Sequence, residues 1–270
     1  MEFKMEKLGF KHYFNYFKEN FIVSFKSLVE YKTNLYNLLF IEVFLAFSML
    51  TFGFVLAENF SEQIGWTFFH FILLYYISML VNDLAGMFYF NKSLFYRLTE
   101  GNFNSYLSKP GNPFLIYIFS YSFNVLISVS IYTVILTVLF IYLKFSILNI
   151  FIALLVMFFS IILYVYFYHF LNSVSFFSLK SGEFLTRFLW NGNRLAGTYP
   201  YPFFNKLKYK FFMLIFPGFI TSALTIPILF GDSIFDLKYQ LIFLVILFLI
   251  SFFGVKFMWK IGLKRYEAFG

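Results

Sequence analysis

Four ionisable side chains stand inside otherwise apolar stretches of this chain of 270 residues: Glu42, His70, Asp83 and His169. An ionisable group in such surroundings is costly, so each is a candidate for binding a ligand or moving a proton. A metal site is not indicated, because neither histidine has another ligand residue at helical spacing. Glu42 and Asp83 remain as candidate pathway residues. The competing interpretations are a structural ion pair or a snorkelling interfacial acid for Glu42, and a helix cap or an interfacial hydrogen bond for Asp83.

The sequence does not favour catalysis. It contains no HExxH, GxSxG or GxxxxGK[ST] segment, so zinc-dependent hydrolysis, a serine nucleophile and a phosphate-binding loop are not indicated. It also has no cysteine, which excludes a thiolate nucleophile and a disulfide. His169 and Asn172 are the two residues that most resemble a catalytic pair. Because of them, an intramembrane lipid-modifying enzyme is kept as an alternative function. We expect a protein with no catalytic residue, no metal and no cofactor of its own.

The elements that must position these residues are apolar helices. The composition is 61% hydrophobic and 13% charged, against roughly 25% charged in an average soluble domain. Residues 110–143 and 145–168 contain no Asp, Glu, Lys, Arg or His. A bilayer core about 30 Å thick is crossed by roughly 20 apolar helical residues. The chain is therefore predicted to be an all-α integral membrane protein with six transmembrane helices.

Basic residues lie at the ends of the apolar stretches, and this distribution orients the chain. Cytoplasmic loops of membrane proteins are rich in Lys and Arg, which places residues 91–113 and the basic residues after Trp259 in the cytoplasm. The acidic loop 58–63 lacks both and is expected outside. We expect both termini to be cytoplasmic and the membrane to be the cell membrane. The net charge of +8 reflects this orientation, not nucleic-acid binding. Clear spans are predicted at 36–57, 64–90, 114–143, 145–170 and 237–259.

Residues 1–34 are predicted to form a cytoplasmic amphipathic helix. Apolar side chains recur there at helical spacing, with lysines off the stripe. A basic helix with a narrow aromatic face is typical of a helix that lies in the membrane interface. Packing against a partner protein is the alternative. The stripe consists of Phe10, Phe14, Phe17, Phe21, Phe25 and Leu28.

Residues 171–238 allow two interpretations. In the first, residues 184–197 form a short fifth span, and residues 200–232 form a re-entrant helical hairpin on the outer side. In the second, residues 211–230 form the fifth span and the residues before them stay cytoplasmic. Both give six membrane segments. The positive-inside rule favours the second, on the count of Lys206, Lys208 and Lys210.

The polar segment after the second span resembles the corresponding segment of type-2 ABC exporter permeases, where an Arg, a Gly, an apolar residue, Tyr-Leu and two prolines recur. Phe103 stands where that family usually has Leu. Three later Pro-containing pairs and the ending 259–270 also resemble a six-span branch of the family, although a tryptophan usual after the first pair is missing. The matching residues are Arg97, Gly101, Phe103, Tyr106, Leu107, Pro110 and Pro113, then Tyr199-Pro200, Phe216-Pro217 and Ile226-Pro227.

The resemblance implies a single permease domain at 35–270 that exports a hydrophobic or amphiphilic drug, peptide or lipid-like substrate by alternating access. It implies a second permease subunit and a separate cytoplasmic ATPase that binds the ATP. It also implies a coupling helix at about 91–109 seated on the ATPase, and it places the re-entrant hairpin 200–232 outside. A non-transporting scaffold or immunity protein is the other alternative. The residues implied to couple to the ATPase are Arg97, Glu100, Gly101, Phe103, Tyr106, Leu107 and Pro110.

Overall fold

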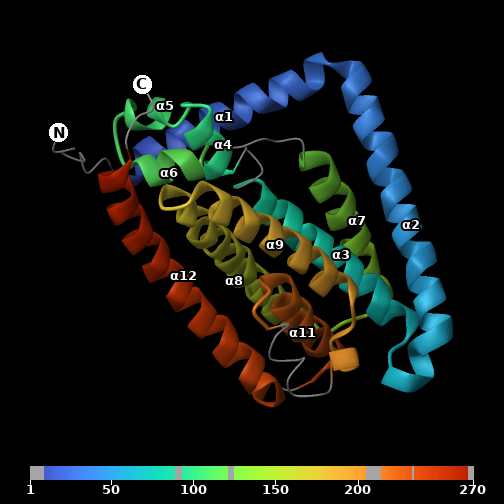
Figure 1. Ribbon diagram of the computed structural model, residues 1–270. Helices are drawn as coiled ribbons and strands as arrows, with labels where there is room; N and C mark the ends of the chain where they lie inside the picture. The colour runs from blue at the N-terminus through green and yellow to red at the C-terminus, as the bar shows by residue number, and fades with distance from the viewer. Residues whose placement is uncertain (1–8, 89–92, 121–124, 205–213, 233, 267–270) are drawn as a thin grey trace.

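The structure, a computed structural model, describes residues 9–88, 93–120, 125–204, 214–232 and 234–266. Every regular element in these ranges is helical (Figure 1). The long helices are α1 (Phe10–Glu30), α2 (Lys32–Ile64), α3 (Phe68–Gly86), α7 (Leu126–Tyr142), α8 (Ile147–Asn172), α9 (Leu179–Thr198), α11 (Pro217–Phe230) and α12 (Lys238–Arg265). The short ones are α4 (Leu94–Thr99), α5 (Asn104–Leu107), α6 (Pro113–Ile118), η1 (Ser173–Phe176), η2 (Tyr201–Phe204) and η3 (Ile234–Leu237).

Four helical segments are long and apolar enough to cross a membrane: Lys32–Ile64, Phe68–Gly86, Ile147–Phe176 and Lys238–Arg265. Each overlaps one of the predicted spans. α7 and α11 are apolar but shorter. The prediction of an all-helical, multi-pass membrane protein is confirmed to this extent.

The predicted third span at 114–143 is wrong as a single helix. α6 ends at Ile118 and α7 begins at Leu126. Near the break, the Ser120 hydroxyl donates to the Tyr117 carbonyl over 2.8 Å, and such a local bond competes with continued helix. The 17 residues of α7 give a length of roughly 26 Å at about 1.5 Å per residue. α7 is therefore the longest helix of this stretch, although it is shorter than the four segments named above.

The main core forms around α11, which packs against α8, α3, α9 and α12 (Figure 1). The α11 side chains Phe219 and Leu224 are fully buried, as are Tyr75 and Tyr76 of α3. α2 is different, because most of its aromatic side chains are exposed. It approaches α3 through small residues such as Gly53, where an added Cβ would lie 3.0 Å from Ile72. Small residues of this kind allow close approach of helices in membranes.

The two ends of the bundle differ in what they contain. We call the end that holds the α2–α3 and α7–α8 turns the turn end. There the His70 ring stacks on Phe230 with centroids 3.7 Å apart, and Phe230 also contacts Phe145. The opposite end, which we call the short-helix end, holds α4, α5, α6 and the end of α12 (Figure 1). Its core forms around Phe103, Tyr117 and Trp259.

α9 connects the two ends. Near its start, an added Cβ at Gly182 would lie 2.5 Å from the backbone nitrogen of Ser175, so only glycine allows this approach of α9 to η1. After its end, Tyr201 of η2 contacts Trp66 in the α2–α3 turn. α11 begins beside the middle of α9, where the Gly218 N–H donates to Asn193 Oδ1 over 2.9 Å. It ends at the turn end, next to His70.

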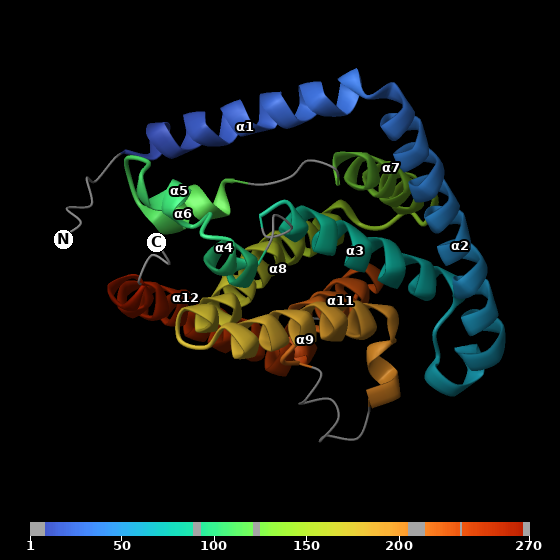
Figure 2. The same cartoon turned by 45° about the horizontal axis from the view of Figure 1, so that its top comes forward.

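α1 lies across the short-helix end (Figure 2). Polar side chains on one face attach it: Tyr13 accepts a hydrogen bond from the Asn112 N–H over 2.7 Å, and Asn20 donates to the Phe119 carbonyl over 3.2 Å. On the predicted aromatic stripe, Phe14 and Phe25 are about half exposed, at 51% and 49%. Much of the stripe is therefore uncovered by the described part of this chain. Phe10 and Leu28 lie outside the residues whose side chains are described.

Candidate functional site

The segment 94–110 is not the single helix that was expected at about 91–109. It consists of α4 and α5, separated by a turn in which Gly101 has φ +69°. The N–H of Phe103 donates back to the Arg97 carbonyl over 3.1 Å and closes this turn. Left-handed backbone of this kind favours glycine, which is the physical reason why the helix stops there. Residues 91 and 92 lie outside the described residues.

Two of the residues implied to touch an ATPase are buried in this chain. Phe103 is 0% exposed and its ring contacts Phe176, Trp259 and Tyr266. Tyr106 is 5% exposed and contacts Tyr117. These side chains anchor the segment to the bundle, and Leu107 is half buried beside them.

The other implied residues lie at the edge of this anchor or on its outer surface. The Arg97 guanidinium lies 5.6 Å from the centre of the Tyr106 ring. Glu100 and Pro110 are exposed, and Glu100 accepts a hydrogen bond from Asn102 over 2.9 Å. We call the exposed surface of the segment the polar face. It is made of Thr99, Glu100, Asn102, Asn104, Ser105, Ser108, Lys109 and Pro110.

Asn172, at the end of α8, holds the segment in place from inside. Its Oδ1 accepts a hydrogen bond from the Leu94 N–H at the start of α4 over 3.1 Å. Its Nδ2 donates to the Tyr117 hydroxyl of α6 over 3.1 Å. Asn172 is 1% exposed. One buried amide therefore joins α4, α6 and α8, a role that the sequence did not reveal.

The histidines have structural surroundings. His169 is 1% exposed, its Nε2 lies 3.0 Å from the Phe88 carbonyl, and its ring contacts Phe114, Tyr117 and Tyr168. His70 belongs to the cap of α3, where its Nδ1 accepts from the Thr67 N–H over 3.1 Å. Among the described residues, no three His, Cys, Asp or Glu side chains gather as a metal site would require.

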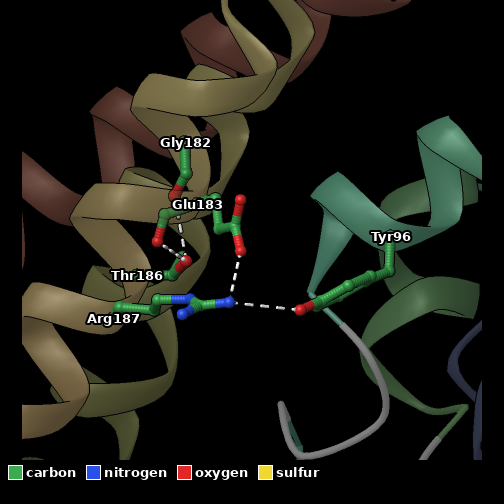
Figure 3. A network of polar contacts seen from close by, with 5 residues as sticks. All are labelled: Tyr96, Gly182, Glu183, Thr186 and Arg187. Atoms are coloured by element: carbon green, nitrogen blue, oxygen red, sulfur yellow. Dashed lines mark hydrogen bonds and ion pairs between the residues drawn. The ribbon is translucent and has the colours of Figure 1, made fainter.

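α4 also contacts the start of α9 (Figure 3). Arg187 Nη2 lies 2.5 Å from Glu183 Oε1 and donates to the Tyr96 hydroxyl over 3.4 Å. The Arg187 side chain is 67% exposed, so solvent screens the pair and it adds little stability. The pair matters because it connects the segment 94–110 to α9, which runs to the other end of the bundle.

A cavity of about 250 Å³ lies between α2, α3, α7, α8, α9 and α11. Asp83 lines it, together with Tyr132, Tyr164 and Asn193. The Tyr132 hydroxyl donates to Glu42 Oε2 over 3.1 Å. The two candidate pathway acids, which are far apart in sequence, are therefore brought to the same place. We call this cavity the acidic pocket.

Asn193 also lines the acidic pocket. The sequence did not predict a role for this residue. It stands in α9, the stretch whose course the sequence left open, so its neighbours were unknown. A polar side chain on an amphipathic helix normally indicates only the solvated face. Here the side chain is 5% exposed.

Comparison with known families and proteins gives one match. A model of the family described as "ABC-2 family transporter protein" matches residues 39–270. No curated protein and no solved structure matches this chain.

Proposed function

This chain belongs to the ABC-2 family of transporter proteins, and from that premise we propose that it is the permease subunit of an exporter driven by a separate cytoplasmic ATPase. Membership of this family identifies the chain as a membrane transport subunit. The observation that supports the ATPase coupling is the segment 94–110, which is anchored by buried aromatic rings on one side and offers the polar face on the other. The substrate is hydrophobic or amphiphilic, and a second permease subunit completes the path.

The polar face is the surface to which the ATPase binds. Glu100, Gly101 and Pro110 stand at the surface and are suited to contact, whereas Phe103 and Tyr106 transmit the movement by being fixed in the bundle. The ATPase supplies the ATP site, because this chain has no phosphate-binding loop.

Movement of the segment reaches the membrane interior along contacts with α8 and α9. Asn172 ties α4 to α8, and Arg187 connects α4 to α9. Both helices line the acidic pocket further along. The complex then has two conformational states, and a ligand and a nucleotide each shift the equilibrium between them. Each affects the binding of the other only as far as its own affinity differs between the two states.

The short-helix end is proposed to face the cytoplasm, with both termini there and α1 lying in the interface. The positive-inside rule supports this orientation. The turn end has the acidic Glu58 and Glu62 beside its Lys144, and α12 begins there at Lys238. The short-helix end carries Lys109, Lys180, Lys260, Lys264 and Arg265.

α9 is proposed as the fifth span and residues 200–232 as a re-entrant hairpin at the outer side. The course of α9 from η1 to the α2–α3 turn supports this interpretation. So does the course of α11, which begins beside Asn193 and ends at His70. The lysine count that favoured the alternative falls on residues 206–210, outside the described residues.

A cysteine introduced at position 203 separates the two topologies. The natural chain has no cysteine, so each introduced thiol is a unique target. Phe203→Cys, at a residue 37% exposed in η2, should react with a membrane-impermeant maleimide in intact cells, as should Gln63→Cys in the last turn of α2. Reaction only after permeabilisation, as expected for Ser105→Cys on the polar face, would instead support a cytoplasmic segment and a fifth span at 211–230.

Co-purification tests the proposed function. When the tagged chain is isolated from its own cells under mild conditions, we expect an ABC-type ATPase subunit to accompany it. Vesicles that contain the complex should then lose substrate transport when ATP is replaced by a non-hydrolysable analogue. A chain that purifies alone after gentle cross-linking, from cells in which it functions, would contradict the proposal.

A further inference from the structure

We propose that the acidic pocket binds an organic cation, an amine that carries an apolar body and a hydrogen-bond acceptor. The inference rests on the proposed export function, because it assigns the class of substrate to this pocket. The observations that carry it are the charges at the pocket, one unpaired buried amide and the nature of the walls.

The charges at the pocket are negative. Asp83 lines it, and Glu42 is linked to it through the Tyr132 hydroxyl. Like charges held near one another in this way repel each other. Among the described residues that line the pocket, none is Lys or Arg. Acidic groups within a membrane are stabilised by pairing with an opposite charge, so a bound cation would relieve the repulsion, and an anion would increase it.

The unpaired amide belongs to Asn193. Its Oδ1 accepts from the backbone N–H of Gly218 over 2.9 Å, and because that N–H can only donate, it fixes which side of the amide is oxygen. Nδ2 is therefore the remaining group, and it is buried with no hydrogen-bond partner among the described residues. A buried donor without a partner costs about 1–3 kcal/mol. A ligand with a carbonyl or ether oxygen would supply the missing acceptor.

The walls favour an apolar ligand of modest size. Leu45, Met49 and Met79 provide apolar surface, and Trp190 adds an aromatic ring to that of Tyr132. Aromatic faces attract cations. The volume of about 250 Å³ is just below the roughly 300–1,000 Å³ of pockets for drug-sized ligands. A small amine fits this description, whereas a long peptide or a whole lipid does not.

A metal ion is not favoured as the occupant. Divalent cations bind to several oxygen ligands, carboxylates above all, and among the described residues no three His, Cys, Asp or Glu side chains gather at one place. The pocket also has more apolar than polar lining residues. An organic cation can pair with the acidic groups and also make apolar contacts with the walls.

The test uses procaine, a tertiary amine with an ester carbonyl. Its neutral analogue has a carbon atom in place of the tertiary amine nitrogen, which is the nitrogen that carries the positive charge. Binding of each radiolabelled compound is measured on the purified full-length permease in nanodiscs, without ATPase or nucleotide. We expect saturable binding of procaine and at least tenfold weaker binding of the neutral analogue. Asp83→Asn should weaken procaine binding at least tenfold, and Glu42→Gln severalfold.

Asn193→Leu provides a second, independent readout. It should weaken procaine binding severalfold and leave unchanged the binding of an amine of similar size without the carbonyl. Glu58→Gln, at an exposed acid near the end of α2, is the matched control and should have no effect. Each variant is compared with the natural chain by thermal unfolding, so a misfolded protein is recognised as such.

Equal affinity for procaine and its neutral analogue would overturn the inference, as would procaine binding unaffected by both Asp83→Asn and Glu42→Gln. The absence of procaine binding would overturn it too. Because no ATPase is present in this assay, its failure is separate from failure of the proposed function, which is decided by co-purification and ATP-dependent transport.

Discussion

Replacement of Asn172 by leucine is expected to destabilise the short-helix end and to abolish ATP-driven transport. The two side chains have the same branched arrangement of heavy atoms, and leucine can form neither of the two buried hydrogen bonds. The N–H of Leu94 loses its acceptor, at a cost of about 1–3 kcal/mol for a buried group, and the Tyr117 hydroxyl loses the hydrogen bond that it accepts from Asn172. α4 would then no longer be fixed to α8. Thermal unfolding of the purified permease and ATP hydrolysis by the complex measure the two effects.

Asn59→Leu is the matched control for this experiment. Asn59 is exposed in α2 and its side chain donates only to the Val55 carbonyl of the same helix. Its replacement should leave the unfolding temperature and the ATP hydrolysis close to those of the natural chain. If Asn172→Leu behaved like Asn59→Leu, the buried amide would not be what holds the segment, and the proposed connection between segment and bundle would fail.

Gly101→Val is expected to reduce stimulation of the ATPase at least tenfold while the bundle stays folded. A Cβ at this position meets no atom within 4 Å, so the Cβ itself causes no clash. The backbone has φ +69°, however, and a residue with a Cβ pays roughly 1–2 kcal/mol for left-handed backbone. We expect the turn to change shape and the polar face to lose its geometry. ATP hydrolysis in reconstituted complexes measures the effect.

Two further variants show whether the left-handed backbone at position 101 is the cause of the reduced ATPase stimulation. Gly9→Val also meets no atom within 4 Å, but Gly9 has φ −68°, so it should have little effect. Gly101→Asn should retain more activity than Gly101→Val, because asparagine tolerates left-handed backbone better than β-branched residues do. Normal stimulation in Gly101→Val would show that the geometry of this turn does not matter for coupling.

The sequence was sufficient to identify the membrane helices that are apolar along their whole length. α8 and α12 are examples, because long stretches without charge have few structures available in lipid other than a spanning helix. The family resemblance was also readable, because it rests on local residues such as Gly101 and Pro110 that determine backbone shape.

The site could be predicted only in part, because its contacts are tertiary. The sequence singled out Glu42 and Asp83 as costly charges, but nothing in it showed that Asp83 lines a pocket to which Glu42 is linked through Tyr132. Phe103 and Tyr106 match the family pattern without indicating that they are buried. Asn172 and Asn193 have no local signature at all. Their importance follows from the elements that meet around them, and these are known only once the helices are packed.

The measurement that most directly tests the central claim is a cross-link from the polar face to the ATPase. Ser105→Cys, exposed on α5, is modified with a short photoreactive maleimide in the isolated complex, and the adduct is identified by mass spectrometry. We expect a cross-link to the ATPase subunit, and none from Gln63→Cys at the turn end. A Ser105→Cys thiol that reacts equally well with and without the ATPase, and that yields no adduct while ATP-driven export continues, would contradict the account.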